Sequence, residues 1–168
     1  MVTFLLIAGW FGGWILLWRL PTLDRRASTR SHRMSVIIPA RNEADRLPFL
    51  LESLLAQTQP PHEVLVIDDH STDGTAAAAA AFPGVTVLPA ADMPPGWTGK
   101  SWACDTGVAL ATGDVLVFLD ADVELAPDAL AALVATWEPQ GGLLSVQPHH
   151  HIVRPVEALS LPFNVVAL

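Results

Sequence analysis

Tyrosine is absent from this sequence of 168 residues, and cysteine and basic residues are scarce. The single cysteine, Cys104, excludes an intrachain disulfide, and a lone thiol is typical of a reducing compartment. No GxGxxG, GxxxxGK[ST] or GxSxG motif occurs, so three common nucleotide-binding and hydrolase signatures are absent. From Met34 onward four basic residues stand against sixteen acidic ones. Because nucleic-acid binding depends on positive charge, this acidic body predicts no nucleic-acid partner.

A long uncharged run opens the chain. Residues 1–18, MVTFLLIAGWFGGWILLW, have a length at the lower end of what crosses a bilayer as a helix. Five basic residues follow this run, whereas a cleaved signal peptide has its basic residues before the apolar run. These five are Arg19, Arg25, Arg26, Arg30 and Arg33. With the positive-inside tendency, they predict a single-pass membrane anchor at 1–20, a basic linker at 21–34 and a cytoplasmic body. A buried core helix or an interfacial helix is the alternative.

Strand-like and helix-like segments alternate along the rest of the chain. The predicted strands occupy residues 35–40, 63–69, 85–89 and 115–120, with a possible fifth at 141–148. The predicted helices occupy residues 42–58, 75–82, 100–112 and 127–137. Expected helix-start residues are Asn42 and Asp73 as caps and Pro127 in a first turn. This alternation predicts an α/β fold with a mostly parallel sheet and helices on both faces.

Polar clusters follow three of the predicted strands: ARNE the first, DDHSTD the second and DAD the fourth. Parallel α/β sheets bind ligands at the carboxyl ends of their strands, so these clusters should gather at one edge. Asp68 and Asp69 could accept hydrogen bonds from the base or ribose of a nucleotide. Lys100, near a helix start, could meet a phosphate or remain a solvated surface lysine.

The segment VLVFLDADVE, residues 115–124, places two carboxylates at the end of a predicted buried strand. Asp120 and Asp122 would point to the same side if the extended backbone continued. Two such charges repel unless a cation lies between them. Mg²⁺ and Mn²⁺ prefer oxygen ligands and bind through one or two carboxylates plus substrate phosphates. The run HHH at 149–151 is a weaker candidate, because three consecutive side chains cannot face one ion.

The ordered segments VIIPARNE, VIDDHSTDGT and GKSWACDTGVALATGDVLVFLDADVE resemble family 2 glycosyltransferases, which have the GT-A fold. The resemblance runs from about residue 35 to residue 147. PPGWTGKSWA and SVQPHH…EALSLPFN are similar to the membrane-bound branch that glycosylates lipids, including carotenoid and hopanoid pathway enzymes. The resemblance implies a Rossmann-like GT-A domain at 35–168, a nucleotide-sugar donor that is most often UDP-linked, and a lipid-type acceptor.

The same resemblance implies roles for individual residues. The nucleotide pocket would be lined by Pro39, Ala40, Arg41 and Glu43, and Asp68 and Asp69 would include the contact to the base. Asp120 and Asp122 would form the DxD motif, with Asp120 toward ribose or water and Asp122 on Mg²⁺ or Mn²⁺. The metal would hold the diphosphate and neutralise charge on the leaving group. The acceptor hydroxyl would attack from the opposite face, which gives inversion.

Two features of the family are missing from the sequence. Its general base is an acid in an ED-type motif downstream of the DxD motif, and a QxxRW-like segment follows. The acids after Asp122 are Glu124, Asp128, Glu138 and Glu157, none in such a motif. We therefore expect that the general base lies beyond Leu168 and that the domain is incomplete at its carboxyl end.

Three other readings remain open on the sequence alone. VLVIDDH resembles the acidic pair of a receiver domain, with Asp120 as phosphoacceptor, but VIIPARNE would then have no role. DADV fits the DxDx[TV] motif of haloacid-dehalogenase-type phosphatases, although that motif belongs on a first strand. A nucleotide-binding fragment or membrane-bound binding protein without turnover is the third.

Overall fold

The computed structural model describes residues 9–10, 23 and 31–146. Residues 23–144 belong to one compact unit, which contains all the elements named here. In chain order they are β1 (Met34–Ala40), α2 (Leu47–Leu55), β2 (Glu63–Asp68), α3 (Thr75–Ala80), β3 (Val85–Pro89), α4 (Gly99–Leu110), β4 (Val115–Phe118) and α5 (Ala129–Trp137).

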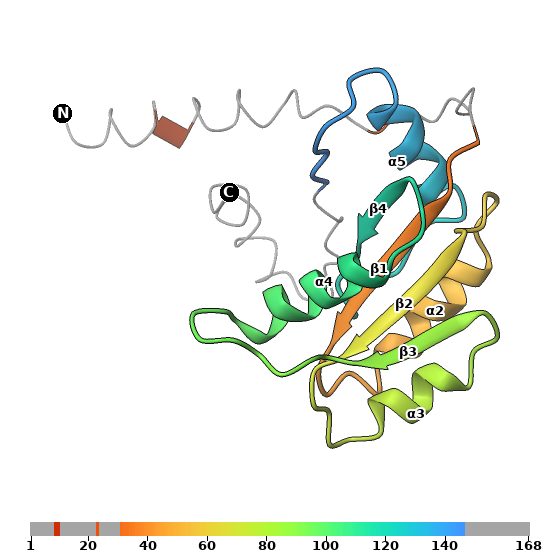
Figure 1. Cartoon of the computed structure of the whole chain (residues 1–168). Coiled ribbons are helices and arrows are strands. Elements are labelled where there is room, and N and C mark those ends of the chain that lie inside the picture. Colours follow the sequence, from red (N-terminus) through yellow and green to blue (C-terminus); the bar gives the residue numbers. More distant parts are fainter. Residues whose placement is uncertain (1–8, 11–22, 24–30, 147–168) are drawn as a thin grey trace. The chain divides into compact units, whose positions relative to one another are not determined.

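The four strands form one parallel sheet in the order β3-β2-β1-β4 (Figure 1). The chain moves outward from β1 through β2 to β3 and then returns to the other side of β1 to form β4. The strand order therefore reverses between β1 and β4, which is where such sheets bind ligands. The predicted parallel α/β fold is confirmed.

Helices cover both faces of the sheet, as predicted (Figure 1). On one face α2, α3 and α5 pack on alternate residues of the central strand, such as Val36 and Ile38. On the other face α4 contributes Ala103 to a smaller cluster around Ile37. Because successive residues of a strand point to opposite faces, β1 is buried on both sides.

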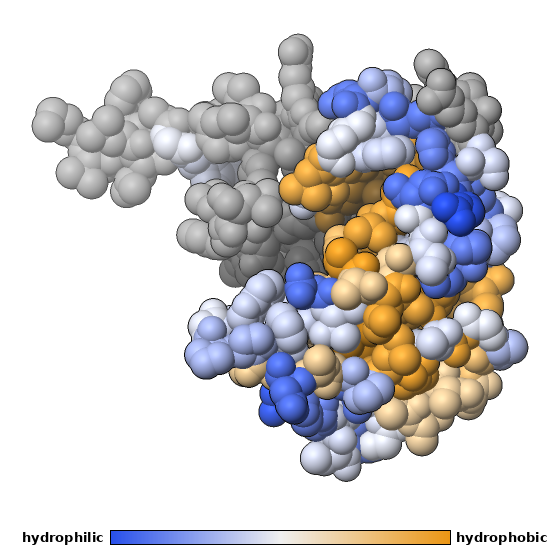
Figure 2. Space-filling view, in the orientation of Figure 1, coloured by the Kyte–Doolittle hydropathy of each residue, from blue (hydrophilic) through white to orange (hydrophobic). Residues whose placement is uncertain are grey.

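The prediction that residues 115–120 form a buried strand is wrong in two respects. β4 is four residues long and, among the strands that the structure describes, lies at the edge of the sheet. Val115 and Val117 pack toward the larger cluster, whereas Leu116 and Phe118 are 39% and 48% exposed. Figure 2 shows hydrophobic residues at the surface in this part of the sheet. An apolar run indicates a strand but does not indicate whether another layer covers it.

The first helix begins later than the sequence predicts. Asn42 is not its N-cap: its φ is +55°, and its side-chain oxygen accepts a hydrogen bond from the backbone N–H of Thr72. The segment before α2 is therefore tied to the loop after β2. The predicted cap by Asp73 is wrong, because Gly74 is the N-cap of α3 and no side chain caps the helix; Asp73 precedes it and accepts a hydrogen bond from the N–H of Thr75. Pro127 precedes α5 rather than forming its first turn.

No helix in the described ranges is long and apolar enough to cross a membrane. The anchor predicted at 1–20 lies outside the described residues except for residues 9–10, so it stays a prediction. The predicted linker is described only at residue 23 and residues 31–34, the last of which starts β1. The predicted strand at 141–148 is wrong for residues 141–146, and its end and the histidine run lie outside the described residues.

Candidate functional site

The carboxyl edge of the sheet carries an open pocket of about 380 Å³. Its walls come from the ends of β1 and β2, the turn after β4 and the first turn of α4. The lining residues are Pro39, Ala40, Arg41, Glu43, Asp69, Gly99, Lys100, Asp120, Ala121 and Asp122. The structure therefore brings three polar clusters, separated by up to 80 residues of sequence, to the point where the strand order reverses.

Of the nine residues predicted from the sequence, all except Asp68 line this pocket. Asp68 is the last residue of β2, and its Oδ1 is buried without a hydrogen-bond partner in the described part of the chain. Asp69, the next residue, faces the pocket instead. Gly99 and Ala121 also line the pocket and were not predicted, because neither has a side chain that suggests chemistry.

Asp69 lies against the start of α4. Its backbone N–H donates to the carbonyl oxygen of Ala40, 2.8 Å away, which fixes it beside the end of β1. Its carboxylate lies 3.4 Å from the guanidinium of Arg41 and 3.1 Å from Nδ1 of His70. A Cβ on Gly99 would collide with Asp69 Oδ2, so this close approach requires glycine. The helix N-terminus adds a favourable field for the carboxylate.

The ARNE segment is held by the loop that follows β2. The N–H of Glu43 donates to the hydroxyl of Thr75 at 2.8 Å, and the N–H of Ala44 donates to the carboxylate of Asp73 at 3.1 Å. The hydrogen bond from Thr75 lowers the pKa of Asp73, which keeps this carboxyl an acceptor. These contacts explain why ARNE and DDHSTD form one wall of the pocket.

Asp120 and Asp122 do not continue an extended strand, so the expectation of a shared strand face is wrong. β4 ends at Phe118, and the chain then turns, with the N–H of Val123 donating to the carbonyl oxygen of Asp120 at 3.3 Å. The turn still directs both carboxylates to the same pocket. Their side chains are 57% and 52% exposed, so a ligand can reach them.

Each of these two carboxylates faces one basic side chain. Lys100 Nζ lies 2.6 Å from Asp120 Oδ1, and Arg46 Nη1 lies 3.6 Å from Asp122 Oδ2. The sequence interpretation missed Arg46, because it placed this residue within the helix predicted at 42–58. In the structure Arg46 is the N-cap of α2, at the carboxyl edge of the sheet.

The chemistry of this pair fits a divalent cation that shares its coordination with a ligand. Within the described ranges, no group of three or more His, Cys, Asp or Glu side chains is arranged to hold a metal. Mg²⁺ in particular binds through one or two carboxylates and completes its shell with water and substrate phosphates. The carboxylates of Asp120 and Asp122 offer hard oxygen atoms, and both residues line the open pocket.

Comparisons with known sequences identify the family. The sequence model of Glycosyl transferase family 2 matches residues 35–155. Two curated relatives are 4,4'-diaponeurosporenoate glycosyltransferases. The one from Staphylococcus haemolyticus is 42% identical over 86% of this chain and 39% of its own length. The one from Staphylococcus aureus is 45% identical over 80% of this chain and 36% of its own length. The chain therefore spans about two fifths of the length of these relatives.

Solved structures agree with this assignment. A mannosyltransferase from Pyrobaculum calidifontis, in complex with GDP-Man and Mn²⁺, has a TM-score of 0.61 at 31% identity, over 79% of this chain and 42% of its own. TarS from S. aureus, in complex with UDP-GlcNAc, has a TM-score of 0.53 at 28% identity, over 63% of this chain and 32% of its own. The fold is GT-A-like, and the chain belongs to glycosyltransferase family 2.

Proposed function

We propose that this chain holds the sugar-donor site of a glycosyltransferase that acts on a nucleotide diphosphate sugar with the help of Mg²⁺ or Mn²⁺. The observation that carries the proposal is the pocket, where the wall formed by the end of β1 and Asp69 meets two exposed carboxylates at the reversal of strand order. Solved relatives that bind GDP-Man with Mn²⁺ or UDP-GlcNAc support it. We propose a UDP-linked sugar for this chain.

The nucleoside would lie on the β1–β2 side of the pocket. Asp69 and Arg41 line the pocket and would contact the base or ribose, while Pro39 and Ala40 would offer backbone at the end of β1. Of the two adjacent acids, Asp69 is the better candidate for the base because it lines the pocket and Asp68 does not. The charge on Asp69 is matched by Arg41 at 3.4 Å, which also orients the carboxylate.

The diphosphate would lie on the β4–α4 side. Asp122 would hold the metal. Asp120 would bind the metal directly, bind it through a water molecule, or contact the ribose instead. When bound, the metal neutralises charge that develops on the leaving diphosphate. Lys100 lies in the first turn of α4, where the helix N-terminus already favours anions, and can meet a phosphate oxygen.

The acceptor is proposed to be a lipid of the carotenoid type, in keeping with the printed names of the curated relatives. Inverting transfer needs a general base close to the acceptor hydroxyl. None of the residues assigned above takes that role. The anchor predicted at 1–20 would keep the pocket on the cytoplasmic face of the cell membrane, beside an apolar acceptor.

Two of the readings that the sequence left open are overturned. A receiver domain and a haloacid-dehalogenase-type phosphatase are both excluded by membership of glycosyltransferase family 2. Nucleotide binding without turnover is the second candidate function, because the chain spans only 36–39% of its curated relatives.

Calorimetric titration of UDP into the full chain, with and without Mn²⁺, tests the donor site. We expect Mn²⁺-dependent binding that Asp122→Ala weakens by about 100-fold or more, equivalent to about 2.7 kcal/mol. The matched control is Glu124→Ala, which removes an exposed acid two residues away and should change affinity by less than about twofold. Absence of Mn²⁺-dependent UDP binding, or full affinity in Asp122→Ala, would contradict the proposal.

A further inference from the structure

The few basic residues of the body gather at the pocket. From Met34 onward there are four basic and sixteen acidic residues. Arg154 and Glu157 lie outside the described residues, so residues 34–146 contain three basic and fifteen acidic residues. Each of the three is paired with a carboxylate that lines the pocket. The pairs are Arg41–Asp69 at 3.4 Å, Arg46–Asp122 at 3.6 Å and Lys100–Asp120 at 2.6 Å. Three of the four carboxylates that line the pocket therefore each face one basic side chain inside a strongly acidic body, and Glu43 is the fourth carboxylate.

This matching places cations on the oxygens that a metal would use. Lys100 Nζ is in direct contact with Asp120 Oδ1, and no ion fits between atoms 2.6 Å apart. A divalent cation at Asp120 and Asp122 would also be repelled by an ammonium and a guanidinium that close. A metal that binds Asp120 Oδ1 directly therefore has to displace Lys100 from that oxygen. Both partners are more than half exposed, so the displacement is modest in cost.

A bound diphosphate would remove one of the two basic residues, Lys100, from its competition with the metal for a carboxylate. Lys100 lines the pocket from the first turn of α4, on a flexible side chain that can swing to a phosphate oxygen. Once it does so, Asp120 is available to the metal. A divalent metal and a diphosphate with two negative charges leave the net charge of the pocket unchanged when both bind. Binding of the metal alone, or of the diphosphate alone, changes the net charge of the pocket.

We infer that Lys100 is an exchangeable counter-ion that couples the metal to the nucleotide: it holds Asp120 until a nucleotide diphosphate takes its charge. This inference rests on the proposed function and deepens it. By linkage, each ligand then tightens the binding of the other by the same factor. Arg46 has a different part, because it faces Asp122 but does not line the pocket. It competes with the metal and does not follow the phosphate.

The variant Lys100→Gln separates the two contributions of this side chain. Binding of Mn²⁺ alone, followed by electron paramagnetic resonance of the free ion, should tighten about two- to fivefold as its competitor is removed. Binding of UDP at saturating Mn²⁺, followed by calorimetry, should weaken about tenfold as a phosphate contact is lost. A folding defect would weaken both ligands, so the opposite signs identify the exchange. Thermal melting of the variant confirms that it is folded.

Two further variants sharpen the assignment. Arg46→Gln should tighten Mn²⁺ about two- to fivefold and leave UDP affinity at saturating Mn²⁺ within about twofold. Arg33→Gln is the matched control, since it also removes one positive charge, from an exposed pair with Asp114 at the other end of the sheet. At an ionic strength of about 0.15 M its effect on the pocket is screened, and both affinities should stay unchanged.

The outcomes distinguish the inference from the proposed function. If Lys100→Gln leaves Mn²⁺ affinity unchanged, or weakens both ligands, Lys100 is not a counter-ion that changes partners. If the unaltered chain binds no UDP in the presence of Mn²⁺, the proposed donor site itself is wrong, and the inference falls with it.

Discussion

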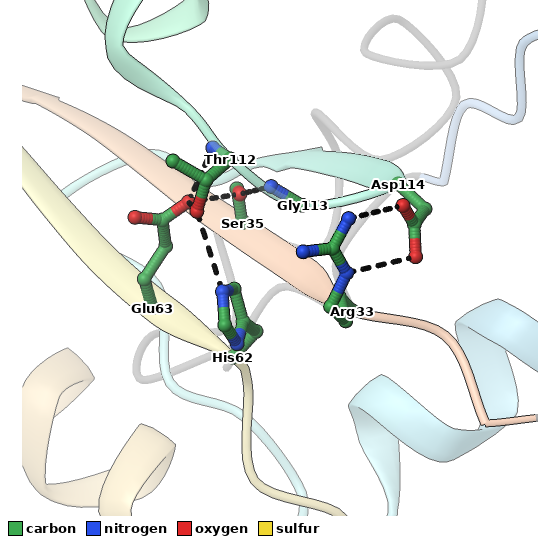
Figure 3. Close-up of polar contacts among 7 residues, drawn as sticks. All are labelled: Arg33, Ser35, His62, Glu63, Thr112, Gly113 and Asp114. Atoms are coloured by element: carbon green, nitrogen blue, oxygen red, sulfur yellow. Dashed lines mark hydrogen bonds and ion pairs between the residues drawn. The ribbon is translucent and has the colours of Figure 1, made fainter.

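The parallel strands end at the carboxyl edge of the sheet and begin at its amino edge. The two edges carry polar clusters of similar composition whose acidic residues have different partners. At the carboxyl edge, Asp120 and Asp122 are half exposed, and each is paired with one flexible basic side chain. At the amino edge, Glu63 Oε1 accepts hydrogen bonds from the hydroxyl of Ser35 at 2.5 Å and from the N–H and hydroxyl of Thr112 at 2.6 and 2.8 Å (Figure 3). Asp120 and Asp122 can exchange partners, whereas Glu63 is held by neutral groups; Asp114, also at the amino edge, pairs with Arg33.

The two edges therefore contribute to different properties, the amino edge to the stability of the fold and the carboxyl edge to ligand binding. Hydrogen bonds from Ser35 and Thr112 to the charged form lower the pKa of Glu63 from 4.5 to about 2. The same network fixes the start of β4, because the N–H of Gly113 donates to the hydroxyl of Ser35 at 2.8 Å (Figure 3). We conclude that the amino edge joins β1, β2 and β4 firmly, while the carboxyl edge keeps its charges available to a ligand.

The largest expected effect is on stability at the amino edge. In Gly113→Ala the new Cβ would lie 2.5 Å from the carbonyl oxygen of Arg33 and 2.8 Å from the backbone nitrogen of Ser35. Because backbone atoms cannot move aside locally, the free energy of unfolding should fall by about 3 kcal/mol. Urea denaturation measures it. A loss below about 1 kcal/mol would show that this edge is not rigid.

A smaller loss is expected from Glu63→Gln, which should lower the free energy of unfolding at neutral pH by about 2 kcal/mol. The folded state depresses the pKa of Glu63, so its stabilisation is complete above pH 4.5 and is lost as the pH falls toward 2. The stability difference between the two proteins should therefore shrink over that range.

Denaturation at a series of pH values tests this dependence. The control is Glu52→Gln, an exposed glutamate on α2 outside the network, which should leave stability nearly unchanged. A stability difference between the original chain and Glu63→Gln that stays constant from pH 7 to pH 2 would contradict the assigned network.

The smallest expected effect on stability is that of Gly99→Ala, the glycine variant at the carboxyl edge that corresponds to Gly113→Ala. In Gly99→Ala the new Cβ collides with the carboxylate of Asp69, a side chain that can turn away. Stability should change by less than about 1 kcal/mol, since alanine is also a better helix former than glycine. UDP affinity should fall about tenfold, or about 1.4 kcal/mol, because Asp69 leaves its place in the pocket.

The two glycine variants serve as each other's control, with denaturation and calorimetry applied to both. Gly113→Ala should affect stability and spare the affinity of the folded protein, and Gly99→Ala should do the reverse. If both variants lowered only the stability, or both lowered only the UDP affinity, the proposed difference between the two edges would be wrong.

The carboxyl-edge residues were predictable because parallel strands end at a common edge. The ends of apolar runs located Asp69 and Asp120 without any knowledge of packing. Arg46 could not be found in this way, because the start of α2 depends on the hydrogen bond between Asn42 and Thr72, thirty residues apart. The exposed face of β4 depends on the order of strands, which an apolar pattern does not encode.

The amino-edge network was missed for a related reason. Ser35, Glu63 and Thr112 are each ordinary residues at the boundary of an element, and only the parallel register brings them together. Gly99 and Gly113 likewise gain their importance from a neighbouring chain segment that the sequence does not identify. Short-range patterns predicted elements and their ends, whereas contacts between distant segments required the fold.

The most direct test of the donor site is an NMR spectrum of the ¹⁵N-labelled chain with UDP and Mn²⁺, compared with UDP and Mg²⁺. Paramagnetic Mn²⁺ broadens nearby amide signals, and the edges lie about 20 Å apart along the seven-residue β1. We predict that signals of residues 40–43, 69–70, 99–101 and 119–123 broaden while those of residues 62–63 and 112–114 persist. Equal broadening at both edges, or at the amino edge alone, would contradict the account.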